Sequence, residues 1–400
     1  MLLGVSALLA MATVPAFASC AESETSAGRD VDASVIAPGT DAGTEDAEPV
    51  DAGCRPTDEN CVTHQLSCDE APWCPVATGV SGFYALTAIW GSSKNDVWAV
   101  GSGGTIVHWD GAKWTATPAS VKNTFNAIWG SGPDNVWIAS ATDTVFHASG
   151  FAGADTLWAR ESLPVDEDNQ APIFAIWGSG AGDVRLAGQS FAMPVPGTED
   201  FISVNGLTRE TLPGGGSEWR GSLGTATVQG LWGSAADDVW AVADNSTNVK
   251  WQLGLTLHGT EAPGADDLEW TEVDSRSSVR LRSVWGSSPN DIWAVGDIGT
   301  IRHVTSADAK QWQVVASPTR ERLHAVWGSA TDDVWAVGEA GTILHYDGKA
   351  WTKTIAAFPL GKKPTLYGVW GSGRNDVWIV GNGIALHYTG GAIVDAGGAP

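Results

Sequence analysis

Six histidines recur at one position of a repeated unit, and imidazoles are common metal ligands. Serine 203 occupies that position in the third unit. Each unit is expected to form its own small sheet around a common axis. The strand that carries this position lies two strands outward from that axis, at about 5 Å per strand. The six side chains therefore lie in six separate sheets and cannot converge on one ion. We therefore predict hydrogen bonds within each unit, with no metal and no cofactor, for His108, His147, His258, His303, His345 and His387.

An acidic residue recurs in a turn of the same unit, which raises the alternative of calcium. Because these positions are also spread over separate units, they cannot form one site. Asp and Asn commonly accept backbone hydrogen bonds in turns, and we expect that role here. The positions are Asp96, Asp183, Asp238, Asp291, Asp333 and Asp376, with Asn135 in the second unit.

No catalytic motif accompanies these residues. The sequence lacks HExxH, a P-loop and a GxSxG nucleophile elbow, and its 13 arginines include no Phe/Tyr-Arg-Ile-Pro motif of sialidases. A pair of carboxylates across two loops, as glycoside hydrolysis requires, stays open as an alternative. The sequence therefore favours a non-catalytic protein without excluding an enzyme.

The cysteines point to an exported protein. Residues 1–19 are an apolar run of signal-peptide length, and Phe17-Ala18-Ser19-Cys20 resembles a bacterial lipobox. Cleavage after Ala18 by ordinary signal peptidase is the alternative. Lipidation of Cys20 would leave an even set of disulfide candidates whose connectivity the sequence does not decide, namely Cys54, Cys61, Cys68 and Cys74.

Composition divides the chain into five parts. Residues 20–53 contain no aromatic residue and many acidic ones, which predicts a disordered tether after the signal peptide of residues 1–19. A cysteine-containing linker is expected at 54–71, the main domain at 72–390 and a tail at 391–400. The formal net charge is −24, and from residue 72 onward 33 acidic residues face 20 basic ones, so nucleic acid is not an expected partner.

Internal repetition predicts the fold. Trp-Gly-Ser occurs seven times, with its Trp at 90, 129, 177, 232, 285, 327 and 370, a spacing of 39 to 55 residues. Each unit contains four short β patterns, which we name strands A to D: an apolar strand ending in Trp-Gly-Ser, then DVWAVG, then TIVHW, then a strand opened by Trp. Four strands in each of seven units predict an all-β, seven-bladed β-propeller.

Tryptophan positions support this assignment and predict how the ring closes. Twenty of the 22 Trp residues fall at the end of strand A or open strands B and D, leaving Trp109 and Trp251. The seventh unit lacks a strand D, whereas PWCPVATG at 72–79 matches one without a preceding blade. We therefore expect the N-terminal strand around Trp73 to complete the seventh blade.

The unit WGSxxxDVWAVGxxGTIxHxDGxxW resembles the tryptophan-rich propeller repeats of bacterial surface and secreted proteins, over residues 72–390. The strand C ends, His108-Trp109-Asp110-Gly111 and His345-Tyr346-Asp347-Gly348, are also similar to the Asp-box of sialidase-like propellers. In that family the Asp-Gly turn is a folding element. The resemblance implies architecture and no particular activity.

Loops of the second to fourth units are longer than the others and predict where a ligand site would lie. Connections from D to A and loops from B to C should emerge on one face, which would bring the segments 160–172, 189–200 and 243–252 together. The alternative that these are tolerated surface insertions stays open. The candidate ligand-binding residues are Asp166, Asp168, Asn169, Arg185, Gln189, Asp244, Asn245, Asn248, Lys250 and Trp251.

Three functions follow as hypotheses. The first is a monomeric, non-catalytic propeller, anchored by lipid to the outer membrane or released outside the cell, that binds protein or polysaccharide. Ala21 after Cys20 favours the outer membrane by the bacterial sorting rule. The second is a secreted glycan-active enzyme, a hydrolase or lyase. The third is an assembly factor for a membrane complex.

Overall fold

The computed structural model describes residues 54, 58–142, 144–164, 171–195, 197, 200–212, 214–224, 226–244, 254–261, 267–391 and 393. The chain divides into the units Met1–Glu48 and Pro49–Pro400, and all described residues belong to the second. The predicted signal peptide, Cys20 and the acidic tether lie outside the described residues.

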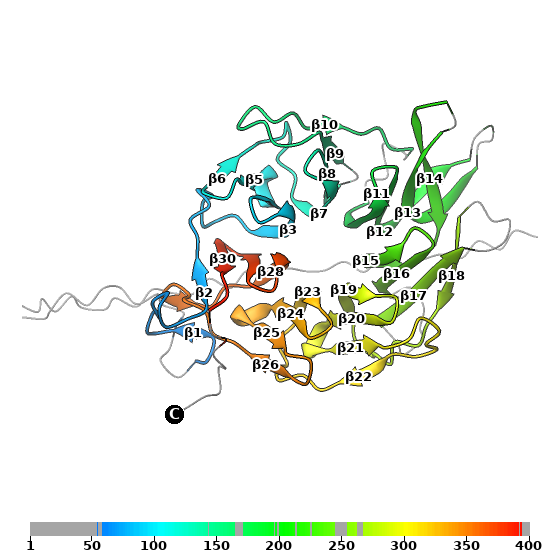
Figure 1. Cartoon of the computed structure of the whole chain (residues 1–400). Coiled ribbons are helices and arrows are strands. Elements are labelled where there is room, and N and C mark those ends of the chain that lie inside the picture. The colour runs from blue at the N-terminus through cyan, green and yellow to red at the C-terminus, as the bar shows by residue number, and fades with distance from the viewer. Residues whose placement is uncertain are drawn as a thin grey trace, which may run out of the picture. The chain divides into compact units, whose positions relative to one another are not determined.

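Seven four-stranded antiparallel sheets form the propeller that the sequence predicts (Figure 1). Strands A to D of the first four blades are β3 (Leu86–Ser93), β4 (Asp96–Gly101), β5 (Ile106–Trp109) and β6 (Trp114–Ala116); β7 (Phe125–Gly132), β8 (Asn135–Ser140), β9 (Val145–Ala148) and β10 (Ala159–Arg160); β11 (Ile173–Gly180), β12 (Asp183–Pro194), β13 (Phe201–Thr211) and β14 (Ser217–Leu223); β15 (Thr227–Ala235), β16 (Asp238–Asp244), β17 (Gly254–Glu261) and β18 (Leu268–Glu272).

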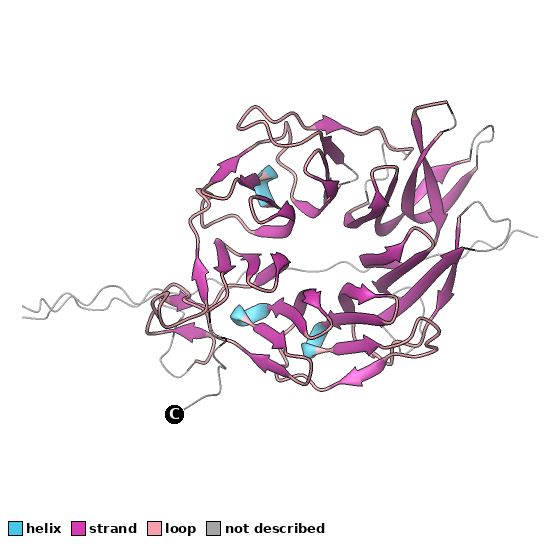
Figure 2. Cartoon of the chain, viewed as in Figure 1, coloured by secondary structure: helices cyan, strands magenta, loops and turns pink. Residues whose placement is uncertain are grey.

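The last three blades complete the ring (Figure 2). The described residues form no helix long and apolar enough to cross a membrane, and their helices are three short 3-10 turns, η1 (Ser102–Gly104), η2 (Asp297–Gly299) and η3 (Glu339–Gly341). The remaining blade strands are β19 (Leu281–Ser288), β20 (Asp291–Gly296), β21 (Ile301–Val304) and β22 (Gln313–Val315); β23 (Leu323–Ala330), β24 (Asp333–Gly338), β25 (Ile343–Tyr346) and β26 (Trp351–Lys353); β28 (Leu366–Gly373), β29 (Asp376–Gly381), β30 (Ile384–Tyr388) and the N-terminal β2 (Trp73–Pro75).

Strand B is strongly apolar in every blade except the third because both of its faces are covered. In β4, Val97, Trp98, Ala99 and Val100 are all completely buried. A strand that packs a neighbouring blade on each side has no solvent-facing residues, so the alternation of apolar and polar residues disappears. The DVWAVG pattern therefore reflects blade-to-blade packing.

The glycine of each Trp-Gly-Ser holds adjacent blades together at the inner strands. A Cβ added at Gly130 would lie 2.5 Å from the ring of Trp90, the strand A tryptophan of the preceding blade. The same close approach occurs at the other six glycines, where the tryptophan of the preceding blade lies within 2.7 Å of the added carbon. Only glycine leaves room for an indole there, so Trp and Gly act as one interlocking unit.

The N-terminal strand closes the ring, as the sequence predicts. β2 pairs antiparallel with β30, and Trp73 lies opposite Tyr388. Disulfides join Cys54 to Cys61 and Cys68 to Cys74, with Cα atoms 5.6 and 5.4 Å apart. The second disulfide ties the segment before β2 to β2 itself.

The cysteine-containing segment also packs on the propeller, which its sequence does not predict. β1 (Cys61–Val62) pairs with β27 (Gly361–Lys362), a strand in the connection between blades 6 and 7. The backbone nitrogen of Lys363 donates to the carbonyl of Asn60 at 2.8 Å. This small sheet fixes the base of the N-terminal segment beside the closing blade.

Blade 3 departs from the expected repeat. The sequence predicts a loop at 189–200, but β12 continues to Pro194 and β13 starts at Phe201, so much of this insertion extends the hairpin. The extension also corrects the alignment of strand C, because Thr208 pairs with Arg185 and Ser203 pairs with Ala192. Thr208, and not Ser203, therefore holds the position that His occupies in the other blades.

Candidate functional site

Each regular blade contains a polar cluster built from four repeated positions, which we call the tetrad. In blade 6 the carboxylate of Asp333 accepts a hydrogen bond from Ser329 on one oxygen and contacts His345 Nε2 at 2.8 Å on the other. The His345 ring packs on Trp335, with ring centroids 4.1 Å apart. The serine is the penultimate residue of strand A, the aspartate is the first residue of strand B, and the histidine in strand C lies opposite the tryptophan in strand B.

The same arrangement recurs in five other blades, which confirms the predicted hydrogen bonds within each blade. Among the residues that the structure describes, no group of three or more His, Cys, Asp or Glu side chains is placed to hold a metal ion. The distances from His Nε2 to the turn residue are 2.6 to 2.7 Å for His108 with Asp96, His147 with Asn135, His258 with Asp238, His303 with Asp291 and His387 with Asp376.

Hydrogen bonding keeps most tetrad carboxyls ionised. Burial alone would raise the pKa of Asp333, but hydrogen bonds from His345 and Ser329 outweigh it and lower the pKa below 3.8. The pKa values of Asp96, Asp291 and Asp376 are lowered in the same way. Both oxygens of such a carboxylate bond to partners inside the blade. We therefore assign these carboxylates a structural role.

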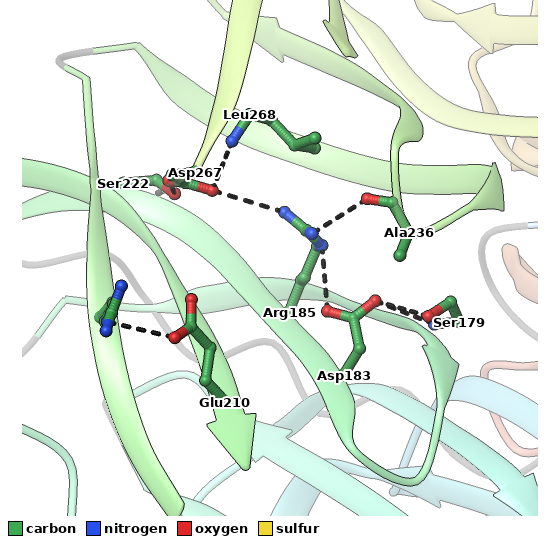
Figure 3. Close-up of polar contacts among 9 residues, drawn as sticks. Ser179, Asp183, Arg185, Glu210, Ser222, Ala236, Asp267 and Leu268 are labelled. Atoms are coloured by element: carbon green, nitrogen blue, oxygen red, sulfur yellow. Dashed lines mark hydrogen bonds and ion pairs between the residues drawn. The ribbon is translucent and has the colours of Figure 1, made fainter. Parts of the chain in front are cut away.

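Blade 3 replaces the tetrad with an arginine (Figure 3). Arg185 stands where strand B otherwise carries Trp, and its Nε lies 3.3 Å from Asp183 Oδ1, the carboxylate that also accepts a 2.7 Å hydrogen bond from Ser179. The guanidinium reaches into blade 4, where Nη2 donates to the carbonyl of Ala236 at 3.1 Å and Nη1 lies 3.7 Å from Asp267. Arg185 therefore links two blades through charge.

The substitution interrupts a ring of tryptophan pairs. At six interfaces the strand B tryptophan meets the strand D tryptophan of the next blade edge to face, with centroids 5.0 to 6.0 Å apart and planes at 80° to 90°. At the interface between blades 3 and 4 the corresponding residues are Arg185 and Trp270. Both line a cavity of about 250 Å³, so the missing indole leaves open volume.

We expect the double substitution Arg185→Trp with Thr208→His to raise the free energy of unfolding by about 1–3 kcal/mol, since it rebuilds the tetrad and fills apolar volume. Calorimetric melting would measure the change. Thr208→His alone is the control: it leaves Arg185 competing for Asp183 and should destabilise the protein. A double variant less stable than the native chain would show that the cavity is not a packing defect of this kind.

The other predicted site residues divide between described and undescribed parts of the chain. Gln189 is exposed, and its backbone nitrogen donates to the carbonyl of Pro172 at 3.0 Å, so the hairpin of blade 3 does meet the connection between blades 2 and 3. Asp244 is buried and binds Arg280 Nε at 2.6 Å. Outside the described residues lie Asp166, Asp168, Asn169, Asn245, Asn248, Lys250 and Trp251.

The face that carries the B-to-C loops and the D-to-A connections is a single surface, as expected. Backbone hydrogen bonds join the two kinds of segment, for example from Ser102 to Ala85 and from Asp297 to Arg280, both 2.9 Å long. Arg322 binds Asp297 at 2.9 Å and Glu339 at 2.7 Å, while Arg282 binds Asp297 at 2.6 Å. We call this surface the loop face.

His324 lies beside these ion pairs and predicts a pH dependence. Burial, together with Arg282 and Arg322, lowers its pKa from 6.5 to about 4, and Asp297 only partly opposes this. Between pH 6.5 and 4 the His324 imidazole is therefore protonated in the unfolded chain but neutral in the folded chain. Stability should fall by about 2–3 kcal/mol as the pH drops through that window.

Urea unfolding at several pH values checks this prediction by comparing the native chain with the variant His324→Asn. Asparagine is chosen because Asn126 occupies the matching position of blade 2. The variant should lose that part of the acid sensitivity which lies between pH 6.5 and 4. An unchanged slope would mean that His324 titrates normally in the folded protein.

Three residues of the blade 3 and blade 4 site were not predicted as site residues: Thr208, Asp267 and Trp270. Trp270 was assigned only to blade packing, because its pattern matches strand D elsewhere. Arg185 itself was the signal that could have found them. Where arginine replaces the strand B tryptophan, the strand D tryptophan of the next blade loses its usual partner.

Comparisons with known proteins support the fold. No family model and no curated protein matches the chain. Solved structures that resemble it include YCF48 bound to D1 peptide (TM-score 0.58, 17% identity, 84% of this chain and 100% of that chain) and YCF48 from Cyanidioschyzon merolae (0.57, 18%, 79% and 98%). The WD40 β-propeller domain of Doa1 also resembles it (0.53, 10%, 79% and 96%). The chain is therefore a seven-bladed β-propeller.

Proposed function

We propose that this protein is a non-catalytic scaffold that binds a polypeptide partner on its loop face and is held outside the cell by a lipid on Cys20. The tetrads support the first part, because they engage six of the seven turn residues in hydrogen bonds to histidine inside the blades. These turn residues are engaged inside the blades, so the proposed function is recognition by the loops that the blades carry.

The observation that carries the proposal is the distribution of exposed apolar side chains. Seven large hydrophobic side chains are exposed among the described residues, and only Leu157 and Val314 lie away from the loop face. Five of the seven therefore emerge from the same face, which favours that face as the interaction surface. The five that emerge from loop-face segments are Phe83, Tyr84, Phe201, Ile298 and Leu360.

Ile298 adds a second indication. It adopts φ 55° in the turn η2, a left-handed conformation that is costly for a β-branched residue, and it is largely exposed. Gly103 stands at the matching position of the turn η1 with φ 68°. A strained and exposed isoleucine contributes nothing to the core, which is consistent with a contact to a partner.

The similar structures agree with protein binding as a role. YCF48 was solved bound to D1 peptide, so a propeller of this architecture can hold a polypeptide segment. We extend that kind of role to this chain on the strength of its own apolar loop face.

Site-specific photo-crosslinking tests the proposal. A benzoylphenylalanine placed at Phe83 or Phe201 on the loop face should capture one polypeptide that mass spectrometry identifies. Leu157 and Val314 serve as matched controls, because Val314 is 55% exposed like Phe201 and Leu157 is 85% exposed where Phe83 is 99%. Equal capture of the same polypeptide from the control positions would contradict a binding role for the loop face.

Palmitate labelling tests the anchor. The native chain expressed in a bacterial host should carry the label and sediment with membranes, whereas Cys20→Ala should lose both. An unlabelled and soluble native chain would instead place cleavage after Ala18 and remove the anchor from the proposal.

A further inference from the structure

The cavity between blades 3 and 4 lies where every other interface contains a tryptophan. Arg185 in β12 lines its wall on blade 3, and Trp270 in β18 lines its wall on blade 4. At the other interfaces both of these positions hold tryptophan. Here the strand D position keeps its tryptophan, and the strand B position holds arginine. The space of about 250 Å³ is thus close to what an aromatic side chain with its contacts requires.

Small residues keep this space open. The buried cluster at this interface consists of Ala187, Val228, Ala241, Ala243 and Leu255, of which three are alanines. Leu231, Leu257 and Trp270 pack against it while only partly buried. Burying an apolar group against these side chains and against the partly exposed Trp270 ring is therefore favourable.

Two charged residues line the cavity, Arg185 and Glu272, and two further carboxylates, Asp183 and Asp267, lie beside Arg185. Arg185 is the cation, and Asp183 and Asp267 already neutralise it. Glu272 also lines the cavity, and it is exposed to solvent. Since the whole chain carries a net charge of −24, a basic ligand is favoured both at the site and during approach.

We propose that this cavity binds one aromatic side chain of a partner polypeptide, with a lysine or arginine next to it in the partner sequence. The proposal rests on the protein-binding function and names the partner chemistry. The aromatic ring contacts Trp270 on one side and the Arg185 guanidinium on the other, because planar guanidinium groups stack well on aromatic rings. The neighbouring cation pairs with Glu272.

Register supports this spacing. Trp270 and Glu272 lie two residues apart on β18 and pair with Gly259 and Leu257, so both face blade 3 at a separation of about 7 Å. A basic side chain adjacent to the bound ring spans that distance. Gly224 and Ala226, in the connection between blades 3 and 4, line the cavity and join it to the loop face.

The test uses the probe peptide acetyl-Ala-Lys-Trp-Lys-Ala-amide carrying 5-fluorotryptophan, followed by fluorine NMR and calorimetry on the full chain. Binding should weaken at least about tenfold when the peptide tryptophan is replaced by alanine. Arg185→Trp with Thr208→His, which fills the cavity from within, should abolish binding. Ala241→Ile is a second filling variant that leaves Arg185 in place, and Ile138 and Ile379 hold the matching position in other blades.

Charge is tested separately. Glu272→Lys should weaken the peptide about threefold, whereas Glu269→Lys, an exposed residue on the opposite face of β18, should leave it unchanged. Equal binding by the native chain and both filling variants, or no binding by the native chain, would overturn the proposal. Binding of the peptide to the Trp251→Ala variant but not to the native chain would also overturn the proposal, because it would indicate that Trp251 competes with the peptide.

The two proposals fail in different ways. If the peptide does not bind but the crosslinks at Phe83 and Phe201 persist, the aromatic site is wrong and the loop-face function stands. If the peptide binds at the cavity and the crosslinks are absent, the site stands without the proposed loop-face partner.

Discussion

Trp73→Ala is expected to lower the free energy of unfolding by about 3–5 kcal/mol, as large buried aromatics do when they are truncated. Trp73 is 0% exposed, and its ring lies 5.0 Å from Trp335 and 5.4 Å from Tyr388. Its carbonyl accepts a 2.9 Å hydrogen bond from the backbone of Ala357. Because β2 has three residues, this side chain supplies most of the packing that holds the closing strand.

Guanidinium unfolding followed by circular dichroism measures this effect, and Trp109→Ala is the matched control. Trp109 lies outside the repeated tryptophan positions and is only partly buried, so its removal should cost clearly less. Trp73→Phe should recover part of the loss because it keeps an aromatic ring against Trp335. If Trp73→Ala cost no more than Trp109→Ala, β2 would not be the element that closes the ring.

Asp333→Ala should be the second severe change, with a loss of about 2–4 kcal/mol. Asp333 is 1% exposed, and its carboxylate is the common partner of Ser329 and His345. Its removal leaves the buried His345 ring without its partner, which costs more than the original bond contributes, whereas the exposed Ser329 can bond to water instead. Asp333→Asn should cost less, since Asn135 fills the same role beside His147 in blade 2.

The pH dependence separates the charge of Asp333 from its hydrogen-bond geometry. The pKa of Asp333 is lowered in the folded state, so its contribution to stability is present above pH 3.8 and is lost as the pH falls through the folded value. Asp333→Asn should remove this acid-sensitive contribution while keeping the hydrogen-bond geometry. Asp332→Ala is the control: its side chain is 57% exposed and pairs with exposed Arg374, so the loss should stay below about 0.5 kcal/mol.

Much of the fold was predictable because its determinants are repeated. Trp90 and Gly130 recur at fixed positions in all seven units, and each unit supplies both halves of an interlock with its neighbours. A pattern repeated seven times averages out the irregularities of any single blade. The role of Trp73 was also predictable, because the seventh unit lacked one strand and the N-terminus offered one.

The candidate site was predicted less completely, and the reason lies in register. Thr208 reached the position of histidine only because β12 and β13 extend their pairing beyond the usual hairpin, and alignment by sequence pointed to Ser203. Strand pairing is set by long-range packing as well as by local pattern. One extended hairpin was therefore enough to shift the assignment by five residues.

The sequence by itself determined the seven blades, the closing strand and the internal use of the histidines, because these depend on local patterns repeated along the chain. Only the tertiary structure decided that Arg185 spans two blades, that Trp270 lacks its tryptophan partner and that Cys74 pairs with Cys68. Each of these depends on which residues of different blades or segments meet in space. Such contacts depend on the closed ring as a whole, and no single repeat encodes them.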